Sequence, residues 1–153
     1  MTIYVLTLLI GVVAGLRGLL PPAVVSWAAY LGHLPLHGTW LAFLGFAATP
    51  YILTVLAVVE LIADKQPKAP SRKAPPGFGA RLVTGAVCGA AIGIAGDVWL
   101  GGLVAGIIGA VIGTLGGYAA RMRLAGTFDR DFPAAIIEDL VAVVAAILIT
   151  AAA

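Results

Sequence analysis

Gly15-Leu16-Arg17-Gly18-Leu19-Leu20-Pro21-Pro22 interrupts the first apolar segment of this chain. A bilayer does not solvate a guanidinium at that depth, so Arg17 is expected to face protein or water and to have a partner. Pro21 and Pro22 cannot donate helical hydrogen bonds, so the helix should break here. Irregular backbone at membrane depth persists only where it is buried in protein or lines a cavity. The stretch therefore predicts a functional site.

The composition indicates a membrane protein. Of the 153 residues, 61% are hydrophobic and 10% are charged, and the mean hydropathy is +1.09, which leaves too little polar surface for a soluble globule. A bilayer span needs about 20 apolar residues. Five stretches approach that length: residues 3–30 (interrupted), 39–63, 80–96, 99–120 and 133–152. We predict an all-α, polytopic membrane protein with about five transmembrane helices, the first of them broken. Residues 1–153 form a single domain, and residues 64–79 form a cytoplasmic linker.

Basic side chains fall on alternate connections of the predicted bundle. One group lies in or just after the linker and a second lies around the last connection: Lys65, Lys68, Arg72, Lys73 and Arg81, then Arg121, Arg123 and Arg130. The connections at residues 32–38 and 96–98 contain no lysine or arginine. The positive-inside rule then predicts an N-terminus in the cytoplasm and a C-terminus outside. The net charge of +2 reflects this asymmetry and does not indicate a nucleic acid partner.

Glycines recur at helical spacing in three of the predicted spans. The packing set is Gly11 and Gly15 in the first span, Gly85, Gly89 and Gly93 in the third, and Gly102, Gly106, Gly109, Gly113 and Gly116 in the fourth. Small-residue faces let two helix backbones approach closely. They predict a tight hairpin of the third and fourth spans, joined through Asp97, which is expected to cap the following helix. The same faces are equally suited to a homo-oligomer, with a dimer as the expected state.

The spacing of Gly11, Gly15 and Gly18 matches that of Gly109, Gly113 and Gly116, which raises the hypothesis of an inverted repeat. Each set is followed by a helix with an acidic motif, Val59-Glu60-Leu61 or Ile137-Glu138-Asp139-Leu140. An odd helix between two copies would invert the second, as in many secondary transporters. The acids lie at different depths in the two copies, so chance similarity remains the alternative.

Four carboxylates lie near the cytoplasmic ends of the second and fifth predicted spans. Glu60 and Asp64 are four residues apart and share a helix face, and Glu138 and Asp139 lie one to two turns inside the last span. They can carry protons or bind a cation. Alternatively they can form structural pairs with Arg17, Lys65 or Arg81, or interact with the dipole at the start of the last span. Both interpretations stay open. The predicted solute- or ion-binding residues are Arg17, Gly18, Pro21, Pro22, Glu60, Asp64, Lys65, Glu138 and Asp139.

Residues suited to soluble-enzyme chemistry are scarce. Ser26 and Ser71 have no nucleophile-elbow context. The single cysteine, Cys88, excludes an intrachain disulfide and a cysteine metal cluster. Pro35 lies between His33 and His37, so one helix cannot present both to a metal. We expect no enzymatic activity, no cofactor and no metal.

Several motifs together resemble the bacterial membrane family catalogued as domain of unknown function 4126. They are Gly15-Leu16-Arg17 with Pro21-Pro22-Ala23, Glu60-Leu61-Ile62-Ala63-Asp64-Lys65-Gln66-Pro67, Arg81, the glycine-rich fourth span ending at Arg121, and Glu138-Asp139-Leu140. The resemblance covers most of the chain and implies a polytopic helical fold in the bacterial inner membrane. It also implies that Arg17, Glu60, Asp64, Lys65, Glu138 and Asp139 are marked positions. It implies no activity, because none is assigned to the family.

Two functions of different classes fit these features. The first is a small transporter or channel for an anionic solute, with proton coupling through the carboxylates, in which Arg17 and the half-helix that begins near Pro21 meet the anionic group. The second is a non-transporting module that binds lipid or a partner through its glycine faces, with its buried charges locked in pairs. Intramembrane ionisable groups favour the first. On that hypothesis Arg17→Gln folds normally but loses solute binding.

Overall fold

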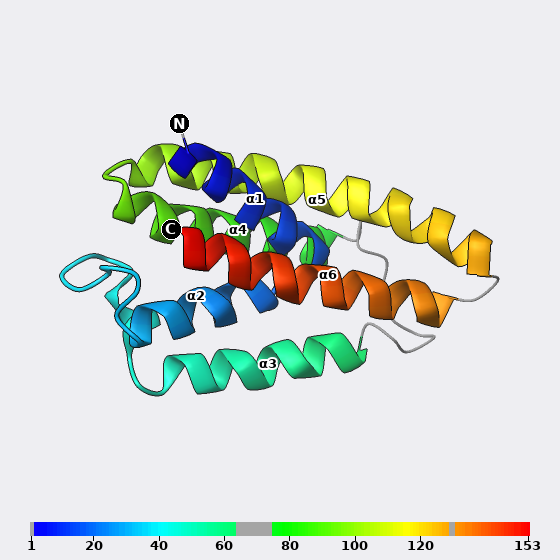
Figure 1. Ribbon diagram of the computed structural model, residues 1–153, viewed down its shortest axis with the longest axis horizontal. Helices are drawn as coiled ribbons and strands as arrows, with labels where there is room; N and C mark the ends of the chain where they lie inside the picture. Colours follow the sequence, from blue (N-terminus) through cyan, green and yellow to red (C-terminus); the bar gives the residue numbers. More distant parts are fainter. Residues whose placement is uncertain (1, 64–74, 129–130) are drawn as a thin grey trace.

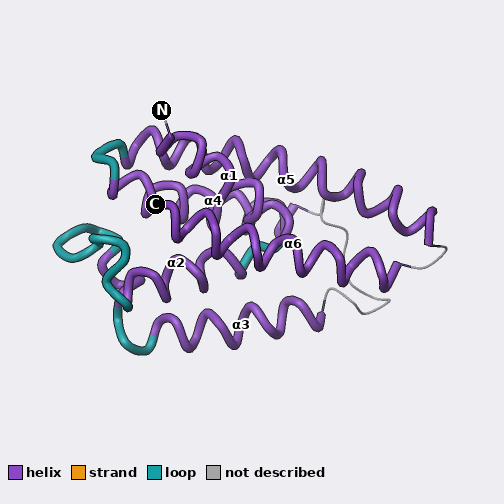
Figure 2. Tube along the Cα trace, viewed as in Figure 1, coloured by secondary structure: helices purple, strands orange, loops and turns teal. Residues whose placement is uncertain are grey.

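Helices make up most of the described chain (Figures 1 and 2). The computed structural model describes residues 2–63, 75–128 and 131–153. Within these ranges there are six α-helices and one short 3-10 helix, η1, and no strand. They are α1 (Thr2–Leu16), α2 (Leu20–Tyr30), η1 (Ala42–Gly45), α3 (Thr49–Ala63), α4 (Pro75–Ala95), α5 (Trp99–Phe128) and α6 (Asp131–Ala152). The predicted all-α class is confirmed.

Three helices are long and apolar enough to cross a membrane. The spanning segments are Gly77–Ala95 in α4, Trp99–Arg123 in α5 and Ala135–Ala152 in α6. Helices α1 and α3 are also apolar but have only 15 residues each. The chain therefore has the character of a membrane protein, as its composition predicts, with three candidate spans where the sequence suggested five.

Helices α1 and α2 form a hairpin instead of one interrupted span (Figure 1). At the start of α1, the Ile3 side chain lies against Gly96, beyond the end of α4, whereas Gly18 lies beside Arg81, near the start of α4. Helix α2 then runs back, and the ring of Trp27 packs edge to face on Tyr51 at the start of α3, with centroids 5.0 Å apart. The chain thus reverses direction at Arg17-Gly18-Leu19, which we call the hairpin tip.

Two prolines lie where the second arm of the hairpin begins. Pro21 and Pro22 occupy the first turn of α2, whose N-cap residue is Leu19. A proline at that position costs no helical hydrogen bond, and its fixed φ suits the start of a helix. The prolines therefore begin a new helix with its own direction instead of kinking a continuous one.

The bundle has two chemically different ends. At the tryptophan end the rings of Trp40 and Trp99 are 5.9 Å apart, and both chain termini lie at this end (Figure 1). At the opposite, arginine end, α5 carries Arg121 and Arg123. The sequence predicted termini on opposite sides, but the chain reversal at the hairpin tip brings them to the same end.

The inverted-repeat hypothesis is not supported by this fold. Tyr4 faces Gly101 and Gly15 packs against Gly113, so α1 and α5 run in the same direction. Helices related by inversion would run in opposite directions. The hairpin tip adds one reversal between the two glycine motifs, which restores the second motif to the direction of the first.

Glycines bring the backbones of α1, α4 and α5 into direct contact. A Cβ added to Gly89 would collide with the carbonyl of Gly102 in α5, and one added to Gly113 would collide with the backbone of Val12 in α1. Helix α5 thus has one glycine face toward α4 and another toward α1. The other glycines of the packing set with such a backbone collision are Gly11, Gly15, Gly85, Gly93, Gly102, Gly106 and Gly109. Gly116 differs from them, because a Cβ there would meet open space.

Asp97 closes α4 through its backbone. Its φ is 57°, in the left-handed region, and its N–H donates to the Ile94 carbonyl at 3.1 Å. The N–H of Val98 donates to the Gly93 carbonyl at 2.9 Å. This pair of bonds is a Schellman motif, in which the left-handed residue is usually glycine and aspartate is tolerated. From the sequence we expected Asp97 to cap the start of α5, whereas its backbone terminates α4.

Two predicted boundaries differ from the observed ones. Helix α4 begins at Pro75, so residues 75–79 of the predicted linker are helical, because prolines suit a first helical turn. Residues 39–48 of the predicted second span form turns and η1. There the Thr39 hydroxyl donates to the Leu36 carbonyl at 2.7 Å and the Thr49 hydroxyl donates to the Phe43 carbonyl at 2.7 Å. Such side-chain bonds compete with a helix for the backbone.

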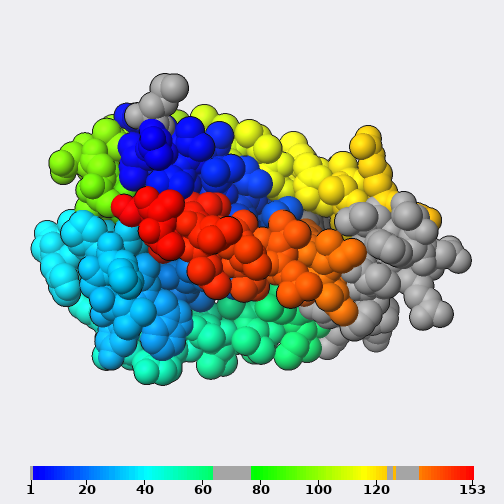
Figure 3. All heavy atoms as spheres, in the orientation of Figure 1, coloured from blue at the N-terminus to red at the C-terminus, as the bar shows by residue number. Residues whose placement is uncertain are grey.

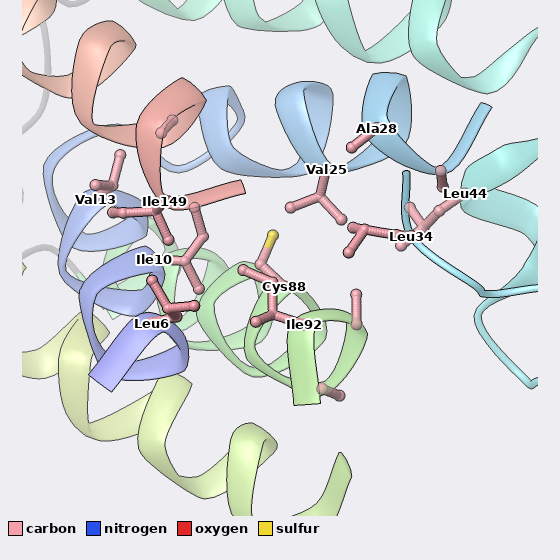
Figure 4. Packing of buried hydrophobic residues seen from close by; sticks show 14 of the residues in the cluster. Leu6, Ile10, Val13, Val25, Ala28, Leu34, Leu44, Cys88, Ile92 and Ile149 are labelled. Atoms are coloured by element: carbon pink, nitrogen blue, oxygen red, sulfur yellow. The ribbon is translucent and has the colours of Figure 1, made fainter. Parts of the chain in front are cut away.

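A hydrophobic core fills the space between the diverging arms of the hairpin (Figure 4). Leu6, Ile10 and Val13 of α1 meet Cys88 and Ile92 of α4. The α2 arm contributes Val25 and Ala28, and α6 contributes Ile149. Helix α6 packs against both arms and lies between them on the face shown in Figure 3. The hairpin tip is therefore enclosed by helices and held in one place.

Candidate functional site

Arg17 is the largest fully buried side chain in the described part of the chain. Its Nε donates a hydrogen bond to Asp139 Oδ1 at 2.6 Å, and its Nη2 forms an ion pair with the same oxygen. Glu138 Oε2 lies 3.7 Å from Nη2. The charge at the hairpin tip is thus compensated by two neighbouring carboxylates of α6.

The end of α1 also receives hydrogen bonds from side chains. Arg17 Nη1 donates to the Leu16 carbonyl at 3.4 Å, and the Thr114 hydroxyl of α5 donates to the Gly15 carbonyl at 3.3 Å. Carbonyls in the last turn of a helix have no helical partner, and a cation near them also favours the helix dipole. Arg17 therefore stabilises the first arm of the hairpin as well as pairing with α6.

Glu60 binds the backbone just before the start of α2. Its two carboxylate oxygens accept the backbone N–H groups of Gly18 and Leu19, each at 2.9 Å. Leu19 offers no side-chain cap of its own, so a carboxylate from α3, about 40 residues away in sequence, caps the helix. Hydrogen bonds to a charged group contribute about 1.5–3 kcal/mol each. Negative charge at a helix N-terminus is also favoured by the dipole.

Gly18 allows the carboxylate to come this close. A Cβ at this position would lie 3.2 Å from Glu60 Oε1 and 3.4 Å from Arg81 Cγ. Both distances are at the tight limit of ordinary contacts, so a larger side chain would push Glu60 or Arg81 away. Arg81 is itself only 7% exposed, and it brings a cation of α4 to the same place.

Glu138 also lies near a second arginine, since its Oε2 is 3.8 Å from Nη1 of Arg121 in α5. Around the hairpin tip the described chain thus gathers three arginines and three carboxylates of balanced formal charge. We call them the tip cluster, which consists of Arg17, Arg81, Arg121, Glu60, Glu138 and Asp139. Charge balance is what burial requires, because an uncompensated buried charge is strongly destabilising.

Most of the predicted site residues lie together. Arg17, Gly18, Glu60, Glu138 and Asp139 meet at the hairpin tip, and Pro21 and Pro22 are buried directly after it. Asp64 and Lys65 lie outside the described residues.

Three residues around the hairpin tip were absent from the predicted set. The sequence marked Arg121 as a topology signal only, and it considered Arg81 as a structural partner of the carboxylates but not as a site residue. Thr114 follows Gly113 on the glycine face of α5, and that neighbourhood was its only signal. In the described residues no group of three or more His, Cys, Asp or Glu side chains could hold a metal ion.

Comparisons with family models, with curated proteins and with solved structures found no match to this chain. The resemblance to domain of unknown function 4126 therefore stays a prediction.

Proposed function

We propose that this chain is a small multi-pass membrane protein that transports or conducts a small anionic solute through the region of the hairpin tip. In this proposal α3, α4, α5 and α6 cross the bilayer, and the α1–α2 hairpin enters and leaves on one side. The positive-inside rule places the arginine end in the cytoplasm, so both termini lie outside the cell. This topology replaces the cytoplasmic N-terminus expected from sequence.

The observation that carries the proposal is the hairpin tip itself. Membrane proteins use re-entrant backbone, in which helices end within the protein, at places where ions and polar solutes pass. Six ionisable side chains surround it, and a bundle that served only as a scaffold could fill such positions with apolar residues at no loss of stability. Intramembrane charges that are retained despite this cost favour a functional role.

The observed contacts of Arg17 and Glu60 change the groups to which we assign solute binding. Arg17 is fully buried and engaged with Asp139, so we assign it the role of positioning the hairpin tip. The anionic group is assigned to the N-terminal end of α2, where the backbone N–H groups already hold a carboxylate. Glu60, Glu138 and Asp139 are the groups through which transport would couple to protons.

Flux measurements in reconstituted vesicles test the proposal. Wild-type protein should release small anions such as formate, acetate, nitrate or chloride faster than empty vesicles, with saturation at high concentration. Gly18→Leu, which places bulk against Glu60 and Arg81, should abolish the flux. Gly116→Leu adds the same side chain where the space is open, and it should retain the flux. Well-folded wild-type protein that moves none of these anions would contradict the proposal.

The pairing of Arg17 with Asp139 favours a second candidate, a non-transporting module that binds lipid or a second copy of the chain. Both glycine faces of α5 are used within the chain, so a dimer would have to use another surface, such as the one around Gly116. Absence of flux together with a stable dimer in detergent, lost in Gly116→Leu, would support this candidate.

A further inference from the structure

The carboxylate of Glu60 is bound at the hairpin tip in the manner of a ligand. Each of its oxygens accepts one backbone N–H, from Gly18 and from Leu19, and both distances are 2.9 Å. The two N–H groups are neighbours in sequence and lie immediately before α2, on Gly18 and on the N-cap residue Leu19, where the helix dipole favours an anion. Two parallel donors spaced for two oxygens on one atom select a planar oxyanion over a spherical ion.

Two arginines and one glycine around this position also favour an anion. The Arg81 side chain is 7% exposed and lies against Gly18, on the same side as Glu60 Oε1. Arg17, which directly precedes Gly18 in the hairpin tip, is fully buried. The absence of a side chain at Gly18 leaves the N–H groups open to the carboxylate. These features belong to the hairpin tip and to α4, whereas Glu60 belongs to α3.

Glu60 itself comes from a helix at the edge of the bundle. Helix α3 packs mainly against α2 and η1. Glu60 is half-buried, whereas Arg17 beside it is fully buried. The carboxylate can therefore leave the hairpin tip through a side-chain or α3 movement that does not disturb the glycine contacts of α1, α4 and α5.

We infer that the N–H groups of Gly18 and Leu19 form a binding position for one small planar oxyanion, a carboxylate such as formate or acetate or the similarly shaped nitrate, and that Glu60 fills this position from within. Solute and Glu60 then exclude each other, and Glu60 acts as a gate. This inference rests on the proposed function for its physiological role, since it names the solute class and the gate of the same site.

The test is chemical rescue of a variant that lacks the internal carboxylate. Glu60→Ala in detergent should have a lower Tm than wild type, because the N–H groups lose their acceptor. Sodium formate should restore several degrees in a saturable manner, since a ligand that binds only the folded state raises Tm. Sodium chloride at the same ionic strength should not. Wild type should not respond specifically to formate, because its position is filled.

Glu60→Gln is the matched control. Its amide has the size and shape of the carboxylate and still fills the space, although its one oxygen can accept only one of the two N–H groups, so formate should raise its Tm much less than that of Glu60→Ala. Equal responses to formate and chloride in Glu60→Ala, or equal formate responses in Glu60→Ala and Glu60→Gln, would overturn the inference.

A second variant covers the case in which Glu60→Ala does not fold. Glu60→Asp keeps the charge but is one methylene too short to reach both N–H groups, and formate should stabilise it. Failure of Glu60→Ala to fold even with formate present throughout purification, together with no formate response in Glu60→Asp, would also overturn the inference. Rescue without vesicle flux would keep the binding position and refute transport. Flux without rescue would support transport and refute the binding position.

Discussion

Asp139 Oδ1 of α6 accepts a hydrogen bond from Arg17 Nε at 2.6 Å, across 122 residues of chain. The contact joins the hairpin tip to a helix at the other end of the sequence. It involves a guanidinium that is 0% exposed. Arg17 therefore depends on Asp139 for its charge compensation, and the hairpin tip depends on Arg17 for its place in the bundle.

Arg17→Gln should destabilise the protein. It leaves Asp139 and Glu138 buried without their main cation, and breaking a buried pair in this way typically costs about 3–5 kcal/mol. Neutralising the partner in the double variant Arg17→Gln, Asp139→Asn should recover part of the loss, as expected for coupled residues. Unfolding in detergent, followed for both single variants and the double variant, measures this coupling. Additive single effects would show that the pair is not coupled, and a normally stable Arg17→Gln would restore the hypothesis of direct solute recognition.

Cysteine labelling should place both termini and His37 on one side of the membrane. In a background without Cys88, cysteines at Thr2, His37 and Ala153 should react with an impermeant thiol reagent in intact cells, and a cysteine at Ser71 should be shielded. The reason is that the hairpin returns the chain to the tryptophan end before α3 begins. A shielded Thr2 position with a reactive Ala153 position would instead indicate a first segment that crosses the membrane once.

Gly113→Ala should lower the melting temperature, because its new Cβ would collide with the backbone of Val12. Overfilling a packed contact costs about 1–3 kcal/mol, and a backbone neighbour yields less readily than a side chain. Gly116→Ala is the control in the same helix, where the Cβ position is open. Alanine also forms helices better than glycine, so this control should be neutral or stabilising. Equal melting temperatures for the two variants would contradict the proposed contact between α1 and α5.

Asp97→Gly should be neutral or stabilising, and Asp97→Val should destabilise. Position 97 has φ 57°, a conformation that costs most L-residues about 1–2 kcal/mol and glycine nearly nothing. A β-branched side chain is the least compatible with it. The order of thermal stabilities, glycine at or above wild type and valine below, checks the turn. A valine variant as stable as wild type would show that this residue does not hold the left-handed conformation.

Composition and spacing determined much of this protein without any structure. The apolar content predicted an all-helical membrane protein, because long segments of this kind can satisfy their backbone in a bilayer only as helices. The charged residue within the first apolar segment and the two prolines after it located the hairpin tip, because each breaks a local rule for a transmembrane helix. Arg17, Glu60, Glu138 and Asp139 were selected for the same reason, as charges on an apolar background.

Only the tertiary structure decided what those residues do together. Pro21 and Pro22 are compatible both with a kinked span and with a new helix of opposite direction, and packing of α2 against α3 selects the second. That single reversal brings the termini to one end and makes α1 and α5 parallel. The pairing of Arg17 with Asp139 and the binding of Glu60 to the backbone of Gly18 and Leu19 likewise join segments that are far apart in sequence. Local spacing carries no information on such contacts, because they depend on which helices become neighbours when the glycine faces of α5 bring α1 and α4 against it.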